Sequence, residues 1–213
     1  LHRSLGVQLS DGSLASAHRS TGQTWTLGAQ CAFFTHASNH FRGQEPELAR
    51  RAEEAAYRAL SSFRRWQRDG PYSPVENRLP PGHRVGYERY TADGHYANLA
   101  ASFLAVAVSN GLNRPFTEPS GGREASLFLE HDPTFRAVLH NGLYSLHFNA
   151  RPAPDYDAFG VVDLTFGPGR FLQFVSSAKH LESGRLFNLG MAVNARSDLA
   201  LIGRMEGAFR RRV

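Results

Sequence analysis

The stretch Phe135-Arg-Ala-Val-Leu-His-Asn-Gly-Leu-Tyr-Ser-Leu-His-Phe-Asn149 places two short apolar runs on either side of Asn141-Gly142. Asn-Gly between two such runs is the strongest short-range signal for a β-hairpin. Further turns are expected at Gly167-Pro-Gly169 and Ser183-Gly184. The candidate strands of this half of the chain are 125–130, 135–140, 143–149, 160–166, 170–175, 185–193 and 198–205. Several short strands at this spacing predict an antiparallel β-region that forms a sandwich or part of one.

The first half of the chain has helical signals instead. Ser20-Thr-Gly-Gln23 fits the capping-box pattern and predicts a helix from residue 21 to residue 39. Pro46 suits the first turn of a second helix, which Gly70-Pro71 ends. Asp93 is a candidate N-cap for a third helix that runs to residue 110.

The sequence therefore predicts an α+β protein in two parts. A helical part covers residues 1–115, and an antiparallel β-region covers residues 123–213. Residues 1–17 are expected to form a loop or an edge strand with a turn at Asp11-Gly12, and residues 71–87 a long loop. The charged residues of the second helix are expected to form a solvated surface that includes Arg50, Arg51, Glu54, Arg58, Arg65 and Arg68.

The charge balance is basic, with a formal charge of +5, and Lys179 is the only lysine. Arginine makes bidentate contacts with carboxylates, sulfates and phosphates, so the composition suits acidic ligands. Nucleic acid is not expected as a partner, because no nucleic-acid recognition motif accompanies the charge. No apolar stretch is long enough to span a membrane. The ends of the sequence lead us to expect a piece of a longer protein, and no oligomeric state is indicated.

Cys31 is the only cysteine, which excludes an intrachain disulfide and a cysteine-based zinc site. It lies in an apolar run and is expected to be a small buried hydrophobic residue. Glycine-rich phosphate loops, the G-x-S-x-G elbow and H-E-x-x-H are absent. A metal site assembled from residues distant in sequence stays open.

The segment Gly86–Leu99 concentrates side chains that can donate, accept or move protons near neutral pH. These side chains are Tyr87, Tyr90, His95, Tyr96 and Asn98. They lead into a helix N-terminus, where the helix dipole favours anions. His83 and Arg84 precede them and could contact an acidic ligand. The alternative interpretation is that the tyrosines are packing residues and that His95 only begins the helix.

His95, Asn98 and Ser102 share one face of the third helix, which is otherwise apolar. Such a polar face needs a partner or a cavity. Carboxylates that could serve a glycosidase are Glu88, Asp93, Asp155, Asp157 and Asp163. Each of them also suits a cap or a turn.

Several helices followed by an antiparallel β-region resemble carbohydrate-active enzymes that join an (α/α) toroid to a β-sandwich. The heparinase II/III-like polysaccharide lyases are the family in question. Tyr90-Thr-Ala-Asp-Gly-His-Tyr96 is similar to the aspartate-glycine-aromatic stretches on the toroid helices of such proteins. Gln23-Thr-Trp25 would suit a sugar cleft. The resemblance implies a toroid-like helical portion followed by a β-sandwich-like region, and a full toroid has more helices than the three predicted here.

The resemblance further implies a secreted or periplasmic lyase that cleaves an acidic, uronate-containing polysaccharide by β-elimination. It implies Tyr96, His95 and Tyr90 as catalytic residues, and it assigns no metal ligand and no particular cofactor. The implied substrate-binding residues are Arg84, His83, Asn98, Tyr87, Trp25 and Gln23. Two alternatives stay open, namely a toroid-type glycoside hydrolase and a non-catalytic carbohydrate-binding or structural domain.

Overall fold

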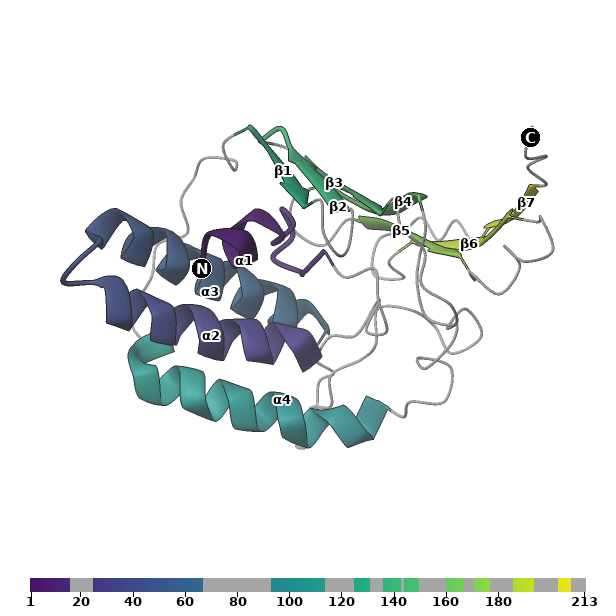
Figure 1. Ribbon diagram of the computed structural model, residues 1–213. Coiled ribbons are helices and arrows are strands. Elements are labelled where there is room, and N and C mark those ends of the chain that lie inside the picture. The colour runs from purple at the N-terminus through teal and green to yellow at the C-terminus, as the bar shows by residue number, and fades with distance from the viewer. Residues whose placement is uncertain are drawn as a thin grey trace.

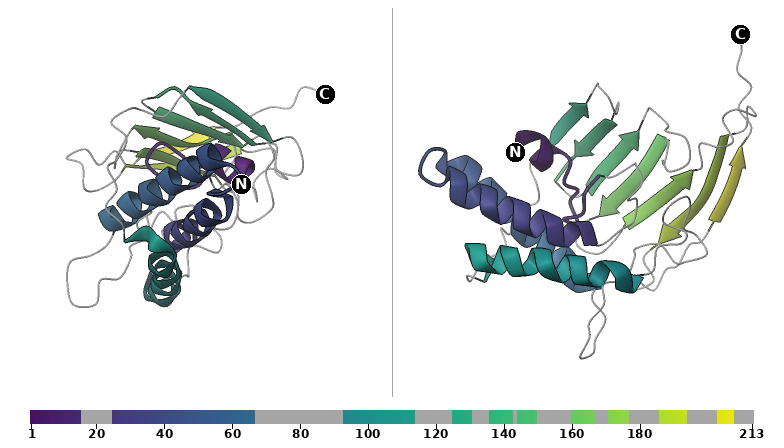
Figure 2. Two further views of the ribbon diagram at one scale, coloured as in Figure 1. Left: turned by 90° about the vertical axis from the view of Figure 1, so that its left-hand side faces the viewer. Right: turned by 60° about the horizontal axis from the view of Figure 1, so that its bottom comes forward.

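The structure combines a layer of helices with an antiparallel sheet, and the helices lie on one face of the sheet (Figures 1 and 2). This computed structural model describes residues 1–15, 25–66, 93–113, 125–130, 136–142, 144–149, 160–166, 171–176, 186–193 and 203–207. The helices are α1 (His2–Gly6), α2 (Trp25–Phe41), α3 (Pro46–Trp66), α4 (Asp93–Ala107) and the π-helical turn η3 (Val108–Leu112). The strands are β1 (Ser126–Glu130), β2 (Arg136–His140), β3 (Tyr144–Asn149), β4 (Gly160–Phe166), β5 (Phe171–Ser176), β6 (Leu186–Val193) and β7 (Gly203–Gly207). The α+β class predicted from the sequence is confirmed.

Helix α2 lies in the middle of the helical layer and contacts both α3 and α4. The thiol of Cys31 lies 3.7 Å from the carbonyl oxygen of Ala56, in the middle of the antiparallel α3. Near its own start, α2 packs closely against the backbone of α4. A Cβ built on Gly28 would lie only 2.9 Å from the carbonyl oxygen of Ala100. Near its end, the Asn39 amide donates to the carbonyl of Asn110 over 2.7 Å. Helices α2 and α4 therefore run parallel.

The main helical core is built from small and apolar residues along the seam between α2 and α3. Pro46 begins α3, as its fixed φ favours, and alanines then recur on the face turned to α2. Ala52, Ala55 and Ala59 are completely buried there. Short side chains allow close approach of the two helices, and Phe34 fills the space beside them.

Residues 1–15 form a segment between the helical layer and the sheet (Figure 1). The prediction of a loop or edge strand for residues 1–17 was wrong at its start, because residues 2–6 form α1. The chain then reverses in a tight turn, where Gln8 and Leu14 make an isolated antiparallel bridge. Gly12 holds a φ of 86° in this turn, a conformation that glycine adopts without strain.

The N-terminal segment is bonded to the helices on one side. The Gln8 amide donates to the carbonyl of Ala55 over 2.8 Å, and Arg65 donates to the carbonyl of Asp11 over 2.6 Å. The prediction of a solvated arginine face on the second helix is therefore wrong for Arg65, whose side chain links α3 to the N-terminal segment. Arg50 and Arg51 are exposed as predicted, and Arg50 pairs with Glu47 and Glu54 on its own helix. The side chains of Glu54 and Arg58 are partly buried instead, and Arg68 lies outside the described residues.

The same segment is bonded to the sheet on its other side. The Ser10 backbone N–H donates to the Ser145 hydroxyl over 2.7 Å, and the hydroxyls of Ser10 and Thr165 lie 2.7 Å apart. Arg136 of β2 donates to the carbonyl of Ala15. The segment also contributes Val7 and other apolar residues to a small core beneath β1 and β2.

The described strands form one antiparallel sheet in which every strand pairs with its neighbours in sequence, from β1 to β7. The hairpin predicted at Asn141-Gly142 is confirmed, with Gly142 at a φ of 89° and the Asn141 side chain accepting from the Tyr144 N–H over 3.0 Å. Between β3 and β4 the register shifts after His147, so that Phe148 pairs with Val161. This shift is a β-bulge and leaves Val162 as the extra residue.

The turn at Gly12 provides a test of the N-terminal segment. A Cβ at residue 12 would collide with the backbone carbonyl of Arg58 on α3, and the positive φ adds strain for any residue with a side chain. We expect Gly12→Ala to lower the free energy of unfolding by at least about 2 kcal/mol, measured by urea denaturation.

Gly43→Ala is the matched control, because nothing lies within 4 Å of a Cβ built at that position. It should change stability by less than about 1 kcal/mol. Equal effects of the two substitutions would contradict the packing of residues 1–15 against α3.

Candidate functional site

The first candidate site is the end of the helical layer where α2 and α4 both begin. Trp25 is the first residue of α2, and it packs, partly buried, against a core cluster that includes Trp66 and Ala100. Asn98 of α4 is exposed, and its carbonyl accepts a hydrogen bond from Ser102 over 2.9 Å. The predicted polar face of this helix therefore includes Asn98 and Ser102 on an open surface.

The other predicted site residues divide into two groups. His95 and Tyr96 belong to the first turn of α4, and their side chains lie outside the described part of the chain. Five further residues lie entirely outside the described residues, namely Gln23, His83, Arg84, Tyr87 and Tyr90. The structure thus brings Trp25 and Asn98 to the same end of two neighbouring helices and leaves the positions of the remaining side chains as predictions.

The electrostatics of this end follow from the parallel packing of α2 and α4. Each helix carries a partial positive charge at its N-terminus, equivalent to roughly half an elementary charge. Two neighbouring helix starts therefore combine their fields. The arrangement favours a negatively charged ligand group.

A second group of polar residues lies on the sheet face that meets the N-terminal segment. The members that are at least 98 % buried are His140, Ser145, His147, Asp163 and Thr165. They belong to three neighbouring strands, and the register places Ser145 opposite Thr165 and His147 opposite Asp163. Sequence reasoning noted Asp163 only as a possible carboxylate and missed the rest, although their spacing of two residues along β3 was a visible signal.

The hydrogen bonds around His140 determine its tautomer. Its Nε2 lies 3.3 Å from the carbonyl oxygen of Gly6 and must donate to it. Its Nδ1 then accepts from the Ser145 hydroxyl, which lies 2.6 Å away. The same hydroxyl oxygen accepts from the Ser10 N–H. This Ser–His pair finds its hydrogen-bond partners within the protein itself and ties the N-terminal segment to the sheet.

The next pair on the same face of β3 and β4, after Ser145 and Thr165, is formed by His147 and Asp163. Nδ1 of His147 lies 3.1 Å from Oδ2 of Asp163, and the two side chains are 0 % and 1 % exposed. Nε2 of His147 has no hydrogen-bond partner among the described residues. Because both side chains are fully buried between the sheet and the N-terminal side of the fold, we interpret the pair as structural.

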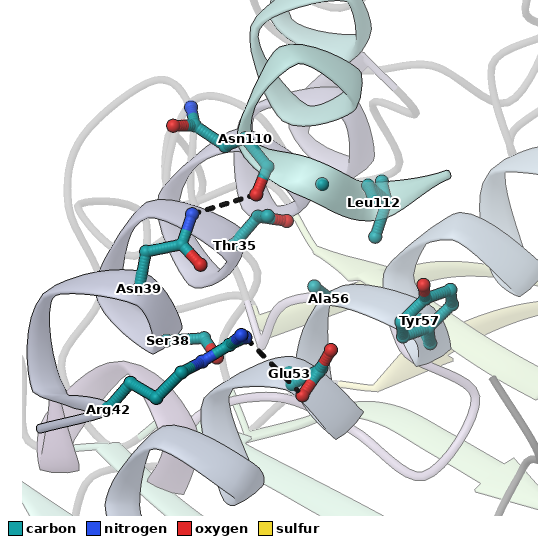
Figure 3. A pocket seen from close by; sticks show the side chains of 10 residues that line it. Thr35, Ser38, Asn39, Arg42, Glu53, Ala56, Tyr57, Asn110 and Leu112 are labelled. Carbon is teal, nitrogen blue, oxygen red and sulfur yellow. Dashed lines mark hydrogen bonds and ion pairs between the residues drawn. The ribbon is translucent and has the colours of Figure 1, made fainter. Parts of the chain in front are cut away.

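A small pocket lies at the opposite end of α2, between α2, α3 and η3 (Figure 3). It encloses about 220 Å³ including its mouth, and Arg42 and Glu53 face each other there at 3.9 Å. Gly111 adopts a φ of 102° within the π-helical turn above it. Its walls are made by Thr35, Ser38, Asn39, Arg42, Glu53, Ala56, Tyr57, Asn110, Gly111 and Leu112. Of the residues predicted for the sugar site, the two whose side chains the structure describes, Trp25 and Asn98, do not line this pocket.

Cys31 is a buried core residue, as the sequence predicted. Burial is the main cause that raises the pKa of its thiol to about 12, against smaller opposing effects from a backbone hydrogen bond and from Arg64. The nucleophilic form of cysteine is the thiolate, so Cys31 is a poor nucleophile in the folded protein.

Two further kinds of feature are absent from the part of the chain that the structure describes. No group of three or more histidine, cysteine, aspartate or glutamate residues there is arranged to hold a metal ion. Among the described helices, none has the length and apolar character needed to cross a membrane. Comparison with known protein families, with curated proteins and with solved structures finds no match to this chain.

The burial of Cys31 predicts its reactivity. With a pKa of about 12, the thiol stays protonated near neutral pH, and the native protein should react with a maleimide far more slowly than a free thiol does. Unfolding in guanidinium should restore rapid, complete labelling. Fast labelling of the native protein, followed by mass spectrometry, would contradict this placement.

The His147–Asp163 pair predicts strong coupling in stability. Removing one partner leaves the other buried without it, so His147→Leu and Asp163→Leu should each cost about 3–5 kcal/mol. The double substitution should cost clearly less than the sum, as measured by urea unfolding in a double-mutant cycle. Ser109→Ala on η3 serves as the control, because it should add to either single change without coupling.

Proposed function

We propose that this chain processes an acidic, uronate-containing polysaccharide and cleaves it by β-elimination. The observation that carries the proposal is the common start of the neighbouring, parallel helices α2 and α4, with Trp25 on one and Asn98 on the other. An aromatic ring suits the face of a sugar, and two helix N-termini suit its carboxylate. The basic composition of the chain agrees with an acidic ligand.

The proposed chemistry uses residues that the sequence places before and within the first turns of α4. Arg84 and Asn98 neutralise the uronate carboxylate, which makes the proton on C5 more acidic. His95 or Tyr96 removes that proton, the C5–H electrons form the C4–C5 double bond, and the C4–O bond breaks. A tyrosine, Tyr90 or Tyr96, protonates the departing oxygen. His83, Tyr87, Trp25 and Gln23 hold the neighbouring sugar units.

We also propose a toroid-like architecture for the helical part. Its support is the direction in which the helices run. In a ring of helical hairpins, the first helix of each hairpin lies beside the first helix of the next and runs parallel to it, as α2 and α4 do. Exposed apolar residues are a second support, namely Leu99 and Val106 on α4 and Val108 on η3. A helix that is apolar on most sides is usually covered by other elements. The β-sandwich expected for the second part likewise belongs to this proposal.

The decisive experiment is incubation with a panel of uronate-containing and neutral polysaccharides. β-Elimination creates an unsaturated sugar that absorbs in the near ultraviolet, whereas hydrolysis creates new reducing ends without that absorbance. Absorbance with the acidic panel would support the lyase. Reducing ends alone would favour a toroid-type glycoside hydrolase, and binding without cleavage would favour a carbohydrate-binding domain.

Substitutions at the start of α4 test the assigned roles. Tyr96→Phe and His95→Ala should each lower the rate of elimination roughly 10²–10⁴-fold, the usual scale for loss of a general acid or base. Ser109→Ala is the matched control, because this exposed residue follows the far end of the same helix. Full turnover by Tyr96→Phe, with only a small loss of stability, would remove Tyr96 from the mechanism.

A further inference from the structure

The pocket between α2, α3 and η3 contains a buried hydroxyl group that no described residue satisfies. Ser38 lines the pocket and is 2 % exposed, and its Oγ has no hydrogen-bond partner among the described residues. A buried hydroxyl without a partner is costly, and native proteins usually supply it with a ligand, an ion or an ordered water. All ten residues that line the pocket belong to described segments.

Two opposite charges lie at the same pocket and do not satisfy each other. The guanidinium of Arg42 and the carboxylate of Glu53 point toward one another in Figure 3, but 3.9 Å separates Nη2 from Oε2. That distance is too long for a hydrogen bond. Within the described part of the chain, neither side chain has another ion pair or hydrogen bond. Both side chains are partly exposed, so they lie nearer to solvent than the Ser38 hydroxyl.

The inner part of the pocket has the size and the acceptors that an ammonium group needs. The space open to the centre of a water-sized group is about 10 Å³, which is close to the least that one such group requires. An ammonium group donates three hydrogen bonds. Three acceptors line the pocket, namely the Ser38 hydroxyl, the Glu53 carboxylate and Oδ1 of Asn39, whose Nδ2 donates to Asn110.

The helix ends beside the pocket add to this preference for a cation. Helix α2 ends at Phe41, and η3, which continues α4, ends at Leu112. Each helix carries a partial negative charge at its C-terminus, equivalent to roughly half an elementary charge. Because α2 and α4 run parallel, these two ends lie together, opposite the end where both helices begin. The π-helical geometry of η3 is a further sign, since such turns are frequent at functional sites.

We propose that this pocket binds a free α-amino acid with a short side chain. The ammonium group occupies the inner space and donates to Ser38, Glu53 and Asn39, while the carboxylate pairs with Arg42 at the mouth. Arg42 repels a simple amine and Glu53 repels a simple carboxylate, so the ligand carries both groups. Two charge-assisted contacts then replace the long contact between Arg42 and Glu53. The total space of about 220 Å³, mouth included, restricts the ligand to the size of glycine or alanine.

The first test is a titration of the whole chain with glycine and with L-alanine, followed through the backbone amide signals in two-dimensional NMR spectra. Signals of residues 38–42, 53–57 and 110–112 should shift, with a dissociation constant of about 1 mM or tighter. Acetate and methylammonium each supply only one of the two charges and should bind at least about tenfold more weakly.

Two outcomes of this titration would overturn the proposal. The absence of shifts with both amino acids up to about 20 mM would mean that the pocket holds water only. Binding of acetate or methylammonium as tight as that of L-alanine would show that the site recognises a single charge and is not built for an amino acid.

The second test is a matched pair of substitutions on α3. Glu53→Gln keeps the shape of the side chain and removes its charge, so the dissociation constant for glycine should rise at least about tenfold. Glu47→Gln is the control, because Glu47 lies on the same helix and pairs with Arg50 at the surface. It should leave the dissociation constant within about twofold. Equal glycine binding by the two variants would contradict the assignment of Glu53.

Ser38→Ala separates contact with a ligand from a structural role. In the ligand-free protein it removes a buried hydroxyl that has no described partner, so the midpoint of urea unfolding should stay the same or rise slightly. The affinity for glycine should fall at least about fivefold, because one acceptor of the ammonium group is lost. A loss of stability with unchanged glycine binding would overturn the proposal. These readouts concern the end of α2 opposite the start of α4, so they can fail while the lyase activity stands, and the reverse.

Discussion

The hydrogen bonds that residues 1–15 make in two directions hold the layers of this structure together. Gln8 donates to Ala55 on the helical side, and Ser10 donates to Ser145 on the sheet side. An irregular segment placed between two layers buries backbone groups that have no regular partner, and each must be satisfied by a side chain. The guanidinium of Arg65 and that of Arg136 supply two of these partners.

The polarity of the inner sheet face follows from this constraint. A sheet that packs on apolar helices needs an apolar inner face, but β2, β3 and β4 meet a segment rich in carbonyl and N–H groups. Ser145, Thr165 and His140 are buried where these groups require partners. The apolar residues of the same strands then occupy the outer face, because successive side chains of a strand alternate.

Local signals predicted the regular elements well. Asn141-Gly142 and the alternation on either side of it located β2 and β3 to within one residue of their observed starts, since a hairpin depends on the turn and on residue spacing alone. Pro46 located the start of α3, again because the signal depends on local backbone geometry alone. The predictions that failed, namely the extended start of the chain and a solvated Arg65, concern residues whose partners lie far away in sequence.

For the candidate site, the sequence by itself determined which residue types gather before and within the first turns of α4, and that Cys31 has an apolar neighbourhood. Tertiary structure alone decided that α2 and α4 run parallel, so that Trp25 and Asn98 share one end. It also decided which face of the sheet is inside. Alternation along a strand separates two faces but does not say which one is buried. That choice depends on the segment packed against the sheet, which contacts it from more than a hundred residues away in the chain.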